Sequence, residues 1–197
     1  MDDASHFLPL YLRFVKGVVD SNDLPLNVSR EILQDHPLVH SIKTALTKRV
    51  IDSLRKLKKD DLSQYSEFWN EFGLVLKEGP AEEPSSKDDI AELFIFSSTV
   101  NENNQINRSF DDYIASCKSD DKKIFYCIGE TYEACANSPH IESLKKANTE
   151  VLLLTDRIDE WLMTSLAEYK GYELVNVAKT DDDSEPDNET LNKDSIE

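Results

Sequence analysis

The sequence is short of glycine, of basic residues and of long apolar runs, and each shortage argues against a class of protein. Only 5 of the 197 residues are glycine, and the patterns G-x-G-x-x-G and G-K-[ST] are both missing, so no loop that cradles a nucleotide phosphate is predicted. The 22 lysines and arginines stand against 39 acidic residues, a net charge of -17, which argues against a nucleic-acid-binding protein. No apolar run approaches the roughly 18–20 residues that a membrane-spanning helix needs.

The sequence also carries no sign of export. The first methionine is followed by Asp2 and Asp3, so the basic start of a secretory signal is missing. Three cysteines are an odd number, which favours reduced thiols and a cytoplasmic protein. Cys127 lies in an apolar run and is expected in the core. Cys135 and His140 have no C-x-x-C pattern or second cluster beside them, so no metal site is predicted.

Two amphipathic helices are predicted in the first half of the chain. In residues 38–59 apolar side chains recur at spacings of three and four, which is typical of a helix with one buried face. The other faces carry seven lysines and arginines. The acidic net charge favours a solvated surface there, with a binding patch as the alternative. Asp60 and Asp61 break the helix, and residues 62–76 form a second one with an aromatic stripe, for which core packing is the simplest interpretation.

Different patterns flank these two helices. Alternation of apolar residues predicts a strand over residues 11–19, and the polar residues around Pro25 predict a loop over 21–27. A short helix is expected over residues 29–34. Gly79 and Pro80 are expected to end the second long helix, and residues 81–86, rich in proline, serine and glutamate, are predicted to be a linker.

Strands and helices alternate after this linker. The continuous apolar run at residues 151–154 is typical of a buried parallel strand, and the alternation predicts a small α/β sandwich. Residues 180–197 carry eight acids and one base, too much charge for a packed core. The predicted strands are 123–128, 151–154 and 172–178, and the predicted helices are 88–93, 109–117, 131–136, 141–147 and 156–169.

Several short blocks form a more specific pattern than the periodicity does. The longest is residues 12–31, LRFVKGVVDSNDLPLNVSRE. Together, and in this order, the blocks resemble the ninety-kilodalton heat-shock chaperone family, and the resemblance covers about residues 6–179. The further blocks are FWNEFG at 68–73, LKEG at 76–79, YCIGETY at 126–132, SPH at 138–140 and VLLLTDRIDEW at 151–161.

The resemblance implies a dimeric, ATP-dependent chaperone of three parts, of which this chain is the later portion of the middle segment. The N-terminal ATP-binding domain and the C-terminal dimerisation domain would lie outside it. The predicted fold class is α/β, comprising the C-terminal part of a larger α/β subdomain, a helical connector and a small α/β sandwich. The predicted divisions are 1–37 with the catalytic loop, 38–80 as the connector, 81–179 as the small subdomain and 180–197 as a disordered acidic tail.

The resemblance also implies a role for Arg30. In the family, the arginine of the loop that matches residues 24–31 reaches the γ-phosphate of ATP, which is bound with Mg mainly by the absent domain. A planar guanidinium suits the charge that spreads over a transferring phosphoryl group, and arginines used in this way contribute roughly 10³–10⁵ in rate. Asn27 and Gln34 would orient the loop or contact phosphate. The residues alone favour a surface arginine that pairs with Glu31 or Asp35. The alternative for Asn27 and Gln34 is that they cap a helix.

Glu160 and Trp161 are the second implied site. An exposed tryptophan is a common anchor for apolar partners, and the resemblance implies that client polypeptides contact the middle segment here. The alternative is a tryptophan packed between helix and sheet. The implied partners are unfolded clients, co-chaperones and the protein's own N-terminal ATPase domain, with homodimers formed only by the full-length protein.

A function of another class stays open. The chain could be a non-catalytic module that holds clients or docks co-chaperones, in which case the basic helix and Trp161 would matter and Arg30 would not. In either case the isolated fragment is expected to turn over no ATP, because the nucleotide pocket lies on other sequence.

Overall fold

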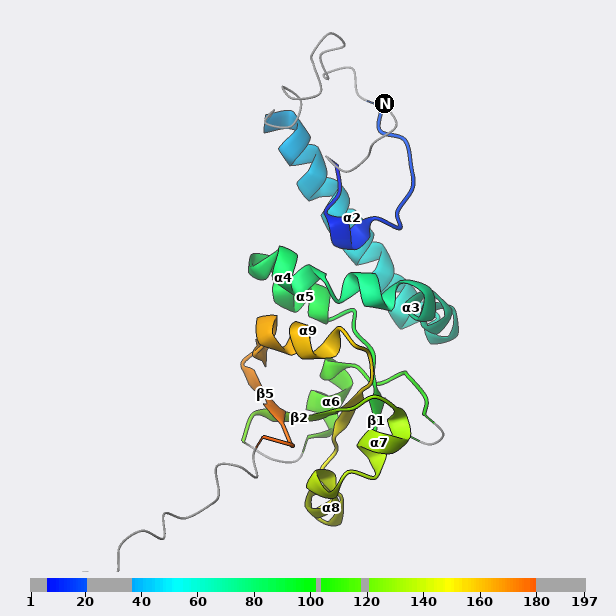
Figure 1. Ribbon diagram of the computed structural model, residues 1–197. Coiled ribbons are helices and arrows are strands. Elements are labelled where there is room, and N and C mark those ends of the chain that lie inside the picture. Colours follow the sequence, from blue (N-terminus) through cyan, green and yellow to red (C-terminus); the bar gives the residue numbers. More distant parts are fainter. Residues whose placement is uncertain (1–6, 21–36, 102–103, 118–120, 180–197) are drawn as a thin grey trace, which may run out of the picture.

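The computed structural model describes residues 7–20, 37–101, 104–117 and 121–179. Two long helices lie at one end of an α/β unit. The first is the farther from the sheet, and the second lies level with a group of short helices (Figure 1). The long helices are α2 (Pro37–Asp60) and α3 (Leu62–Leu76). The short elements that follow them are α4 (Gly79–Glu82), the 3-10 helix η2 (Pro84–Ser86) and α5 (Lys87–Ala91).

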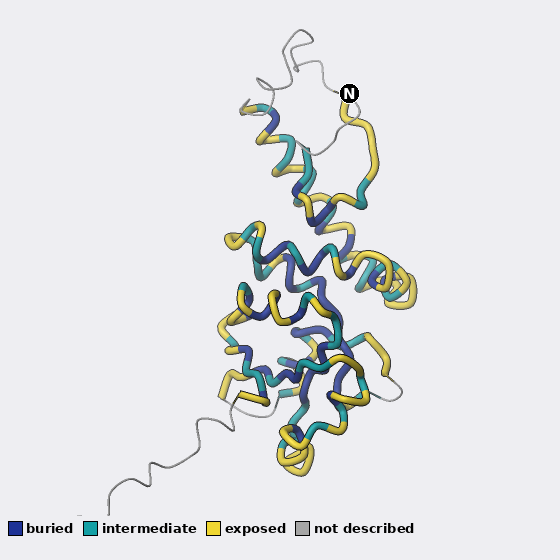
Figure 2. Tube along the Cα trace, in the orientation of Figure 1, coloured by how far each residue is buried: buried dark blue, intermediate teal, exposed yellow. Residues whose placement is uncertain are grey.

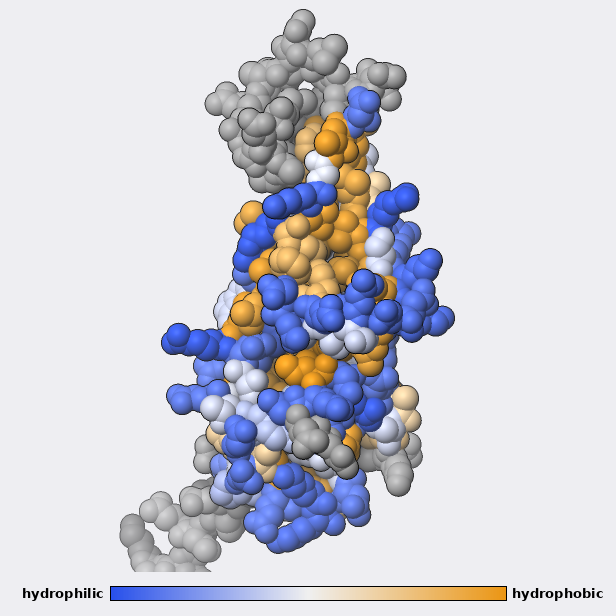
Figure 3. All heavy atoms as spheres, turned by 90° about the vertical axis from the view of Figure 1, so that its right-hand side faces the viewer, coloured by the Kyte–Doolittle hydropathy of each residue, from blue (hydrophilic) through white to orange (hydrophobic). Residues whose placement is uncertain are grey.

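The two long helices confirm the predictions over residues 38–59 and 62–76. The Asp61 side chain accepts the Gln64 N–H at 2.9 Å, which satisfies a free donor of the first turn of α3. Tyr65 and Trp69 of the aromatic stripe are buried, as predicted. Phe72 is exposed instead and stacks on Phe14, with 4.9 Å between the ring centroids. Figure 3 shows the side of the molecule to which α3 belongs, with apolar side chains gathered in its upper half.

The strand predicted over residues 11–19 is wrong. The chain forms the 3-10 helix η1 (Leu10–Leu12), then a turn and an irregular segment through residue 20. Tyr11 and Leu12 are neighbours and both buried, whereas a strand with one buried face would expose one of them. A strand also needs a partner for its backbone groups, and no described residue pairs with this segment in a sheet.

The end of the second helix also differs from the prediction. Helix α3 ends at Leu76, and Gly79 and Pro80 begin the new helix α4 instead of closing the old one. Proline is tolerated in a first turn because its missing N–H would have no intrahelical acceptor there. Residues 81–86, predicted as a linker, lie mostly in α4 and η2. The division of the chain at residue 81 stays a prediction.

Within the described residues, the sheet has five strands in the order β1-β3-β2-β5-β4. The central strands β3, β2 and β5 are parallel, and the edge strands β1 and β4 are antiparallel to their neighbours. The three predicted strands are confirmed to within a residue or two, and the two short edge strands were not predicted. The strands are β1 (Ser97–Ser98), β2 (Lys123–Ile128), β3 (Leu152–Leu154), β4 (Glu168–Tyr169) and β5 (Tyr172–Asn176).

Alternate residues of the sheet face two different cores. Ile124 and Leu152 belong to the larger cluster, which includes side chains of α6 (Phe110–Ser116) and α9 (Asp159–Ser165). Cys127 is buried, as predicted, in a smaller cluster against α7 (Tyr132–Ala136) and α8 (Pro139–Lys146). Helices therefore cover both faces, which confirms the α/β fold class, and Figure 2 shows the buried segments concentrated in this half.

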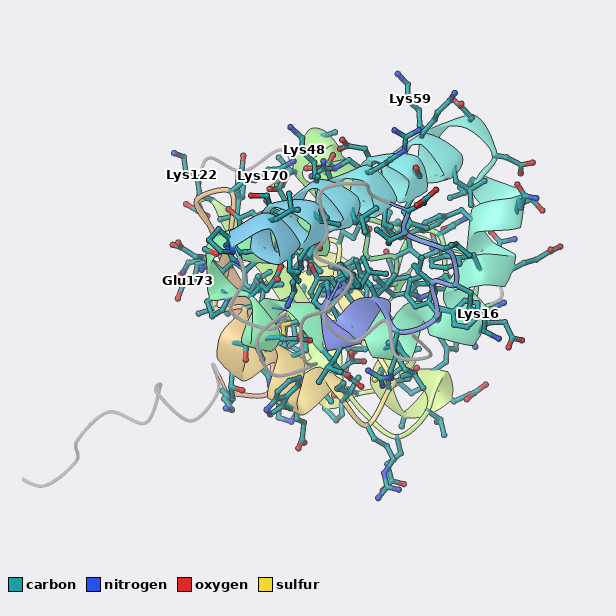
Figure 4. The ribbon with its side chains drawn as sticks, turned by 90° about the horizontal axis from the view of Figure 1, so that it is seen from above. Lys16, Lys48, Lys59, Lys122, Lys170 and Glu173 are labelled. Carbon is teal, nitrogen blue, oxygen red and sulfur yellow. The ribbon has the colours of Figure 1, made fainter. Side chains whose placement is uncertain are left out.

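The basic face of α2 is solvated only in part. Lys48 and Lys59 are exposed and point outward (Figure 4), as predicted. Arg55 instead pairs with Asp89 and Glu92, its Nε lying 2.9 Å from Glu92 Oε2. Lys58 is half-buried and donates to the Glu92 carbonyl oxygen. These two bases fasten α2 to α5 because their long stems can pack while their charged ends reach acceptors.

Candidate functional site

Of the two predicted sites, the structure describes the client contact and does not describe the residues predicted to act on ATP. Arg30, Asn27 and Gln34 lie outside the described residues. Glu160 and Trp161 lie in the first turn of α9, and both are exposed, with Trp161 at 48%. The alternative that Trp161 packs between helix and sheet is therefore wrong. The candidate site is the outer surface of this helical turn.

The local sequence explains why this turn faces outward. Strand β3 leads into a turn that begins at Asp156, and α9 follows at once. Leu162 and Met163 are buried and lie three and four residues after the buried Asp159, which is the helical spacing of an inner face and leaves Glu160 and Trp161 on the outer one. The predicted helix over 156–169 is shorter in the structure, because the turn precedes it and the chain enters β4 two residues after Leu166.

Two hydrogen bonds close the turn before α9. The Asp159 N–H donates to the Asp156 carbonyl oxygen at 2.9 Å. In return, the Asp156 N–H donates to Asp159 Oδ2, also at 2.9 Å. Asp159 therefore ends the turn with its backbone and holds the start of the turn with its side chain.

Lys77, just after α3, binds both carboxylates of this turn. Its Nζ lies 2.6 Å from Asp159 Oδ1 and 2.6 Å from Asp156 Oδ2. The Lys77 side chain is 2% exposed and that of Asp159 is 0% exposed. Burial raises the pKa of Asp159, although the Lys77 ammonium opposes this shift. Lys77 was not among the functional residues predicted from the sequence, and the available signal was its place in the LKEG block.

A cavity of about 470 Å³ adjoins Glu160 where strands β2 and β3 end. Loops that follow neighbouring parallel strands meet at the same edge of a sheet, which places their side chains together. The cavity wall includes the charged residues Glu130, Asp156 and Arg157 as well as Glu160. The arrangement offers an exposed indole beside charged groups, which suits contact with a polypeptide.

The segment that carries Lys77 also holds the N-terminal part of the chain. Arg13 makes two hydrogen bonds to the Glu78 carboxylate, at 2.5 and 2.7 Å. Glu82 accepts the backbone N–H groups of Leu10 and Tyr11 at 2.8 and 3.1 Å. Residues 7–20, which lead toward the segment that contains Arg30, are therefore tied to α4.

Comparison with known proteins places the chain in a family. The model of the family described as "Hsp90 protein" matches residues 1–197, the whole chain. The chain belongs to the Hsp90 family. This confirms the resemblance inferred from the sequence blocks.

The curated relatives of this Hsp90-family chain include several proteins named chaperone protein HtpG. The chain is 52% identical over 185 residues to the protein from Salmonella typhimurium, with 94% of this chain and 30% of the relative covered. It is 53% identical over 181 residues to the protein from Pasteurella multocida, and 52% identical over 182 residues to that from Yersinia enterocolitica, each with 92% of this chain and 29% of the relative covered. The chain thus spans about 30% of the length of these relatives.

No group of three or more histidine, cysteine, aspartate or glutamate side chains among the described residues could hold a metal ion. Among the helices described, none is long and apolar enough to cross a membrane.

Proposed function

We propose that this chain is the middle portion of an ATP-dependent molecular chaperone that acts in protein folding. The observation that carries the proposal is the match of the Hsp90 family over the whole chain, with 52% identity to a protein named as a chaperone. Because the chain spans about 30% of that relative, the activity belongs to a longer protein. Other parts of that protein would bind ATP with Mg and form the homodimer.

In this proposal Arg30 acts on ATP that a separate nucleotide-binding domain holds. Its guanidinium would donate to the γ-phosphate oxygens as charge spreads over them, once the domains close. Asn27 and Gln34, in the same segment, would orient the arginine or contact phosphate. The assignment rests on the family signature at residues 12–31.

Glu160 and Trp161 would form the contact for client polypeptides. The exposure of the indole supports this, because a large aromatic side chain in water gains free energy when an apolar partner covers it. Unfolded proteins and co-chaperones are the proposed partners, and the cytoplasm is the proposed location.

ATP turnover by the full-length protein tests the catalytic part of the proposal. We expect Arg30→Ala to lower steady-state turnover by a factor on the order of 10³ while ATP affinity stays within a few fold, because the arginine acts on the transition state. Arg49→Ala is a matched control, since Arg49 is an exposed arginine of α2. Unchanged turnover in Arg30→Ala would contradict the catalytic role.

A second candidate function is a non-catalytic module that binds clients or docks co-chaperones, and the exposed Trp161 favours it. Competition for an unfolded client separates the two functions. The module requires that Trp161→Ala weakens client binding and that Arg30→Ala affects neither client binding nor turnover. Equal binding by the wild type and Trp161→Ala would contradict a client role for this surface.

A further inference from the structure

Helix α9 is too short to set its own orientation. It has seven residues, whereas isolated helices shorter than about 12–15 residues are marginal in water. Within the described residues, its N-cap Ile158 contributes no side-chain hydrogen bond to the free donors of the first turn. The direction in which Glu160 and Trp161 point must therefore be set by contacts with other elements.

Lys77 supplies such a contact at the start of the helix. Its ammonium lies 2.6 Å from a carboxylate oxygen at each end of the turn, one on Asp156 and one on Asp159. The two residues are also joined by the reciprocal backbone and side-chain hydrogen bonds of the turn. One cation thus fixes the turn that directly precedes Glu160 and Trp161, and it does so from the end of α3.

The surroundings of Lys77 make this contact specific. The Nζ atom lies 5.1 Å from the ring centroid of Phe96 and 5.8 Å from that of Trp69. The rings exclude water and leave the ammonium with the two carboxylates as its charged acceptors. Removing one partner of a buried pair leaves the other without compensation, so such a pair favours one arrangement of the elements that it joins.

We propose that Lys77 is a positioning residue for the surface formed by Glu160 and Trp161. It holds the first turn of α9 against the end of α3, so that the indole points into solvent where a polypeptide can reach it. The part of the proposal that concerns clients rests on the proposed function, whereas the positioning of Trp161 does not depend on it.

Tryptophan fluorescence of the 197-residue chain can measure this positioning. The sequence has two tryptophans, of which Trp69 is 5% exposed and Trp161 is 48% exposed, so the neutral quencher acrylamide reports mainly on Trp161. The test variant is Lys77→Met/Asp159→Asn, which removes both charges of the buried pair and keeps an oxygen that can accept the Asp156 N–H. The same variant with Trp161→Phe added gives the contribution of Trp69 for subtraction.

A matched control removes a lysine–carboxylate pair elsewhere. Lys146 pairs with Glu142 at 2.8 Å on α8, and both side chains are exposed, so Lys146→Met should leave quenching unchanged. Client binding is measured in parallel with a reduced, carboxymethylated polypeptide that has no stable fold. Thermal unfolding of each variant shows whether it is folded at the temperature of the assay.

We expect the double variant to stay folded, to change the quenching constant of Trp161 at least twofold and to bind the polypeptide at least fivefold more weakly. Wild-type quenching in the folded double variant would overturn the positioning role. If that variant does not fold, Asp156→Asn is tested instead, because it removes the charge of the partly exposed carboxylate that Lys77 binds. Its quenching should change in the same direction by a smaller factor, and wild-type quenching would overturn the proposal.

The outcomes for positioning and for client binding are distinguishable. If Trp161→Ala binds the polypeptide as tightly as the wild type, the client role fails, and the quenching result still decides whether Lys77 positions α9. If Trp161→Ala weakens binding while the folded double variant binds and quenches like the wild type, the client role stands and the positioning role is overturned.

Discussion

Lys77 and Glu78 are neighbours in sequence, yet each joins a different pair of elements. The ion pair of Lys77 is buried, whereas that of Glu78 is partly exposed to solvent. Lys77 reaches the turn before α9 and forms a pair with Asp159 in which the two side chains are 2% and 0% exposed. Glu78 reaches the N-terminal segment and pairs with Arg13, with side chains that are 33% and 48% exposed. The contact distances are nearly equal, 2.6 Å and 2.5 Å. Distance alone therefore does not rank the two pairs, because water screens one and not the other.

The carboxyl groups of the two pairs respond in opposite directions. Burial raises the pKa of Asp159 against the influence of Lys77. The hydrogen bond from Arg13 lowers the pKa of Glu78, with burial opposing it. The first pair is thus dominated by the cost of removing charge from water, and the second by a charge-assisted hydrogen bond at the surface.

The largest effect that we expect comes from removing the buried cation. Lys77→Met should lower the free energy of unfolding by about 3–5 kcal/mol, because it leaves the Asp159 carboxylate buried without its partner. Urea unfolding at pH 7 measures the loss. Adding Asp159→Asn should recover part of it, since no charge is then buried. A loss below about 1 kcal/mol would mean that the buried pair contributes no more to stability than an exposed pair does.

The deficit of Lys77→Met should depend on pH. Without Lys77, the pKa of Asp159 rises further above the unfolded value of about 3.9, so the folded state takes up a proton that the unfolded state releases. Stability relative to the wild type then falls as pH rises from 4.5 to 7.5, by about 1.4 kcal/mol for each unit of additional shift up to pH 7.5. Unfolding curves at both pH values test this. If the stability of Lys77→Met/Asp159→Asn shows the same pH dependence, a group other than Asp159 causes it.

A smaller effect is expected where the N-terminal segment meets α4. The Tyr11 ring is buried, and its hydroxyl donates to Glu83 Oε2 at 2.9 Å. Tyr11→Phe should cost about 1 kcal/mol, because the Glu83 carboxylate is only partly buried and can bind water instead. Chemical denaturation measures the change. A loss as large as that of Lys77→Met would show that this junction behaves like the buried one.

The smallest effect should come from the exposed pair. Glu78→Gln should lower stability by less than about 1 kcal/mol, and the difference should shrink at high salt. Since the pKa of Glu78 is lowered, its contribution is present above the unfolded value of about 4.3 and is lost as pH falls through the folded pKa. Unfolding of both proteins between pH 3 and 7 measures this. A difference that grows on acidification would contradict the assignment.

Local sequence patterns were sufficient to predict the helices and strands whose residues show a clear periodicity, cap or apolar run. The heptad-like spacing of α2 and the acidic break before α3 predicted two helices that the structure confirms. Ser109 caps α6 by accepting the Asp112 N–H, and this helix was predicted over residues 109–117. Strands β2 and β3 could be predicted because they consist mainly of consecutive apolar residues, and β5 could be predicted from its apolar residues Tyr172, Leu174 and Val175.

Elements that depend on a partner far away in the sequence could not be predicted from local patterns. Residues 10–12 form the 3-10 helix η1, and Glu82, 71 residues after Tyr11, accepts the backbone N–H groups of Leu10 and Tyr11 at its start. The edge strands β1 and β4, two residues each, exist through pairing with their neighbours. The site was predicted through Glu160 and Trp161, whereas Lys77 was missed because it lies 82 residues from Asp159.

By itself, the sequence determined the family, the long helices and the central strands, and it supplied the two α9 residues that we propose as a client contact, since these follow from signature blocks, periodicity and composition. Only the tertiary structure decided that Lys77 is buried against Asp159, that Glu78 stays at the surface and that Trp161 is exposed. The physical reason is that side-chain burial and pairing are set by elements that meet across long stretches of chain, and a short window of sequence contains only one of the two partners.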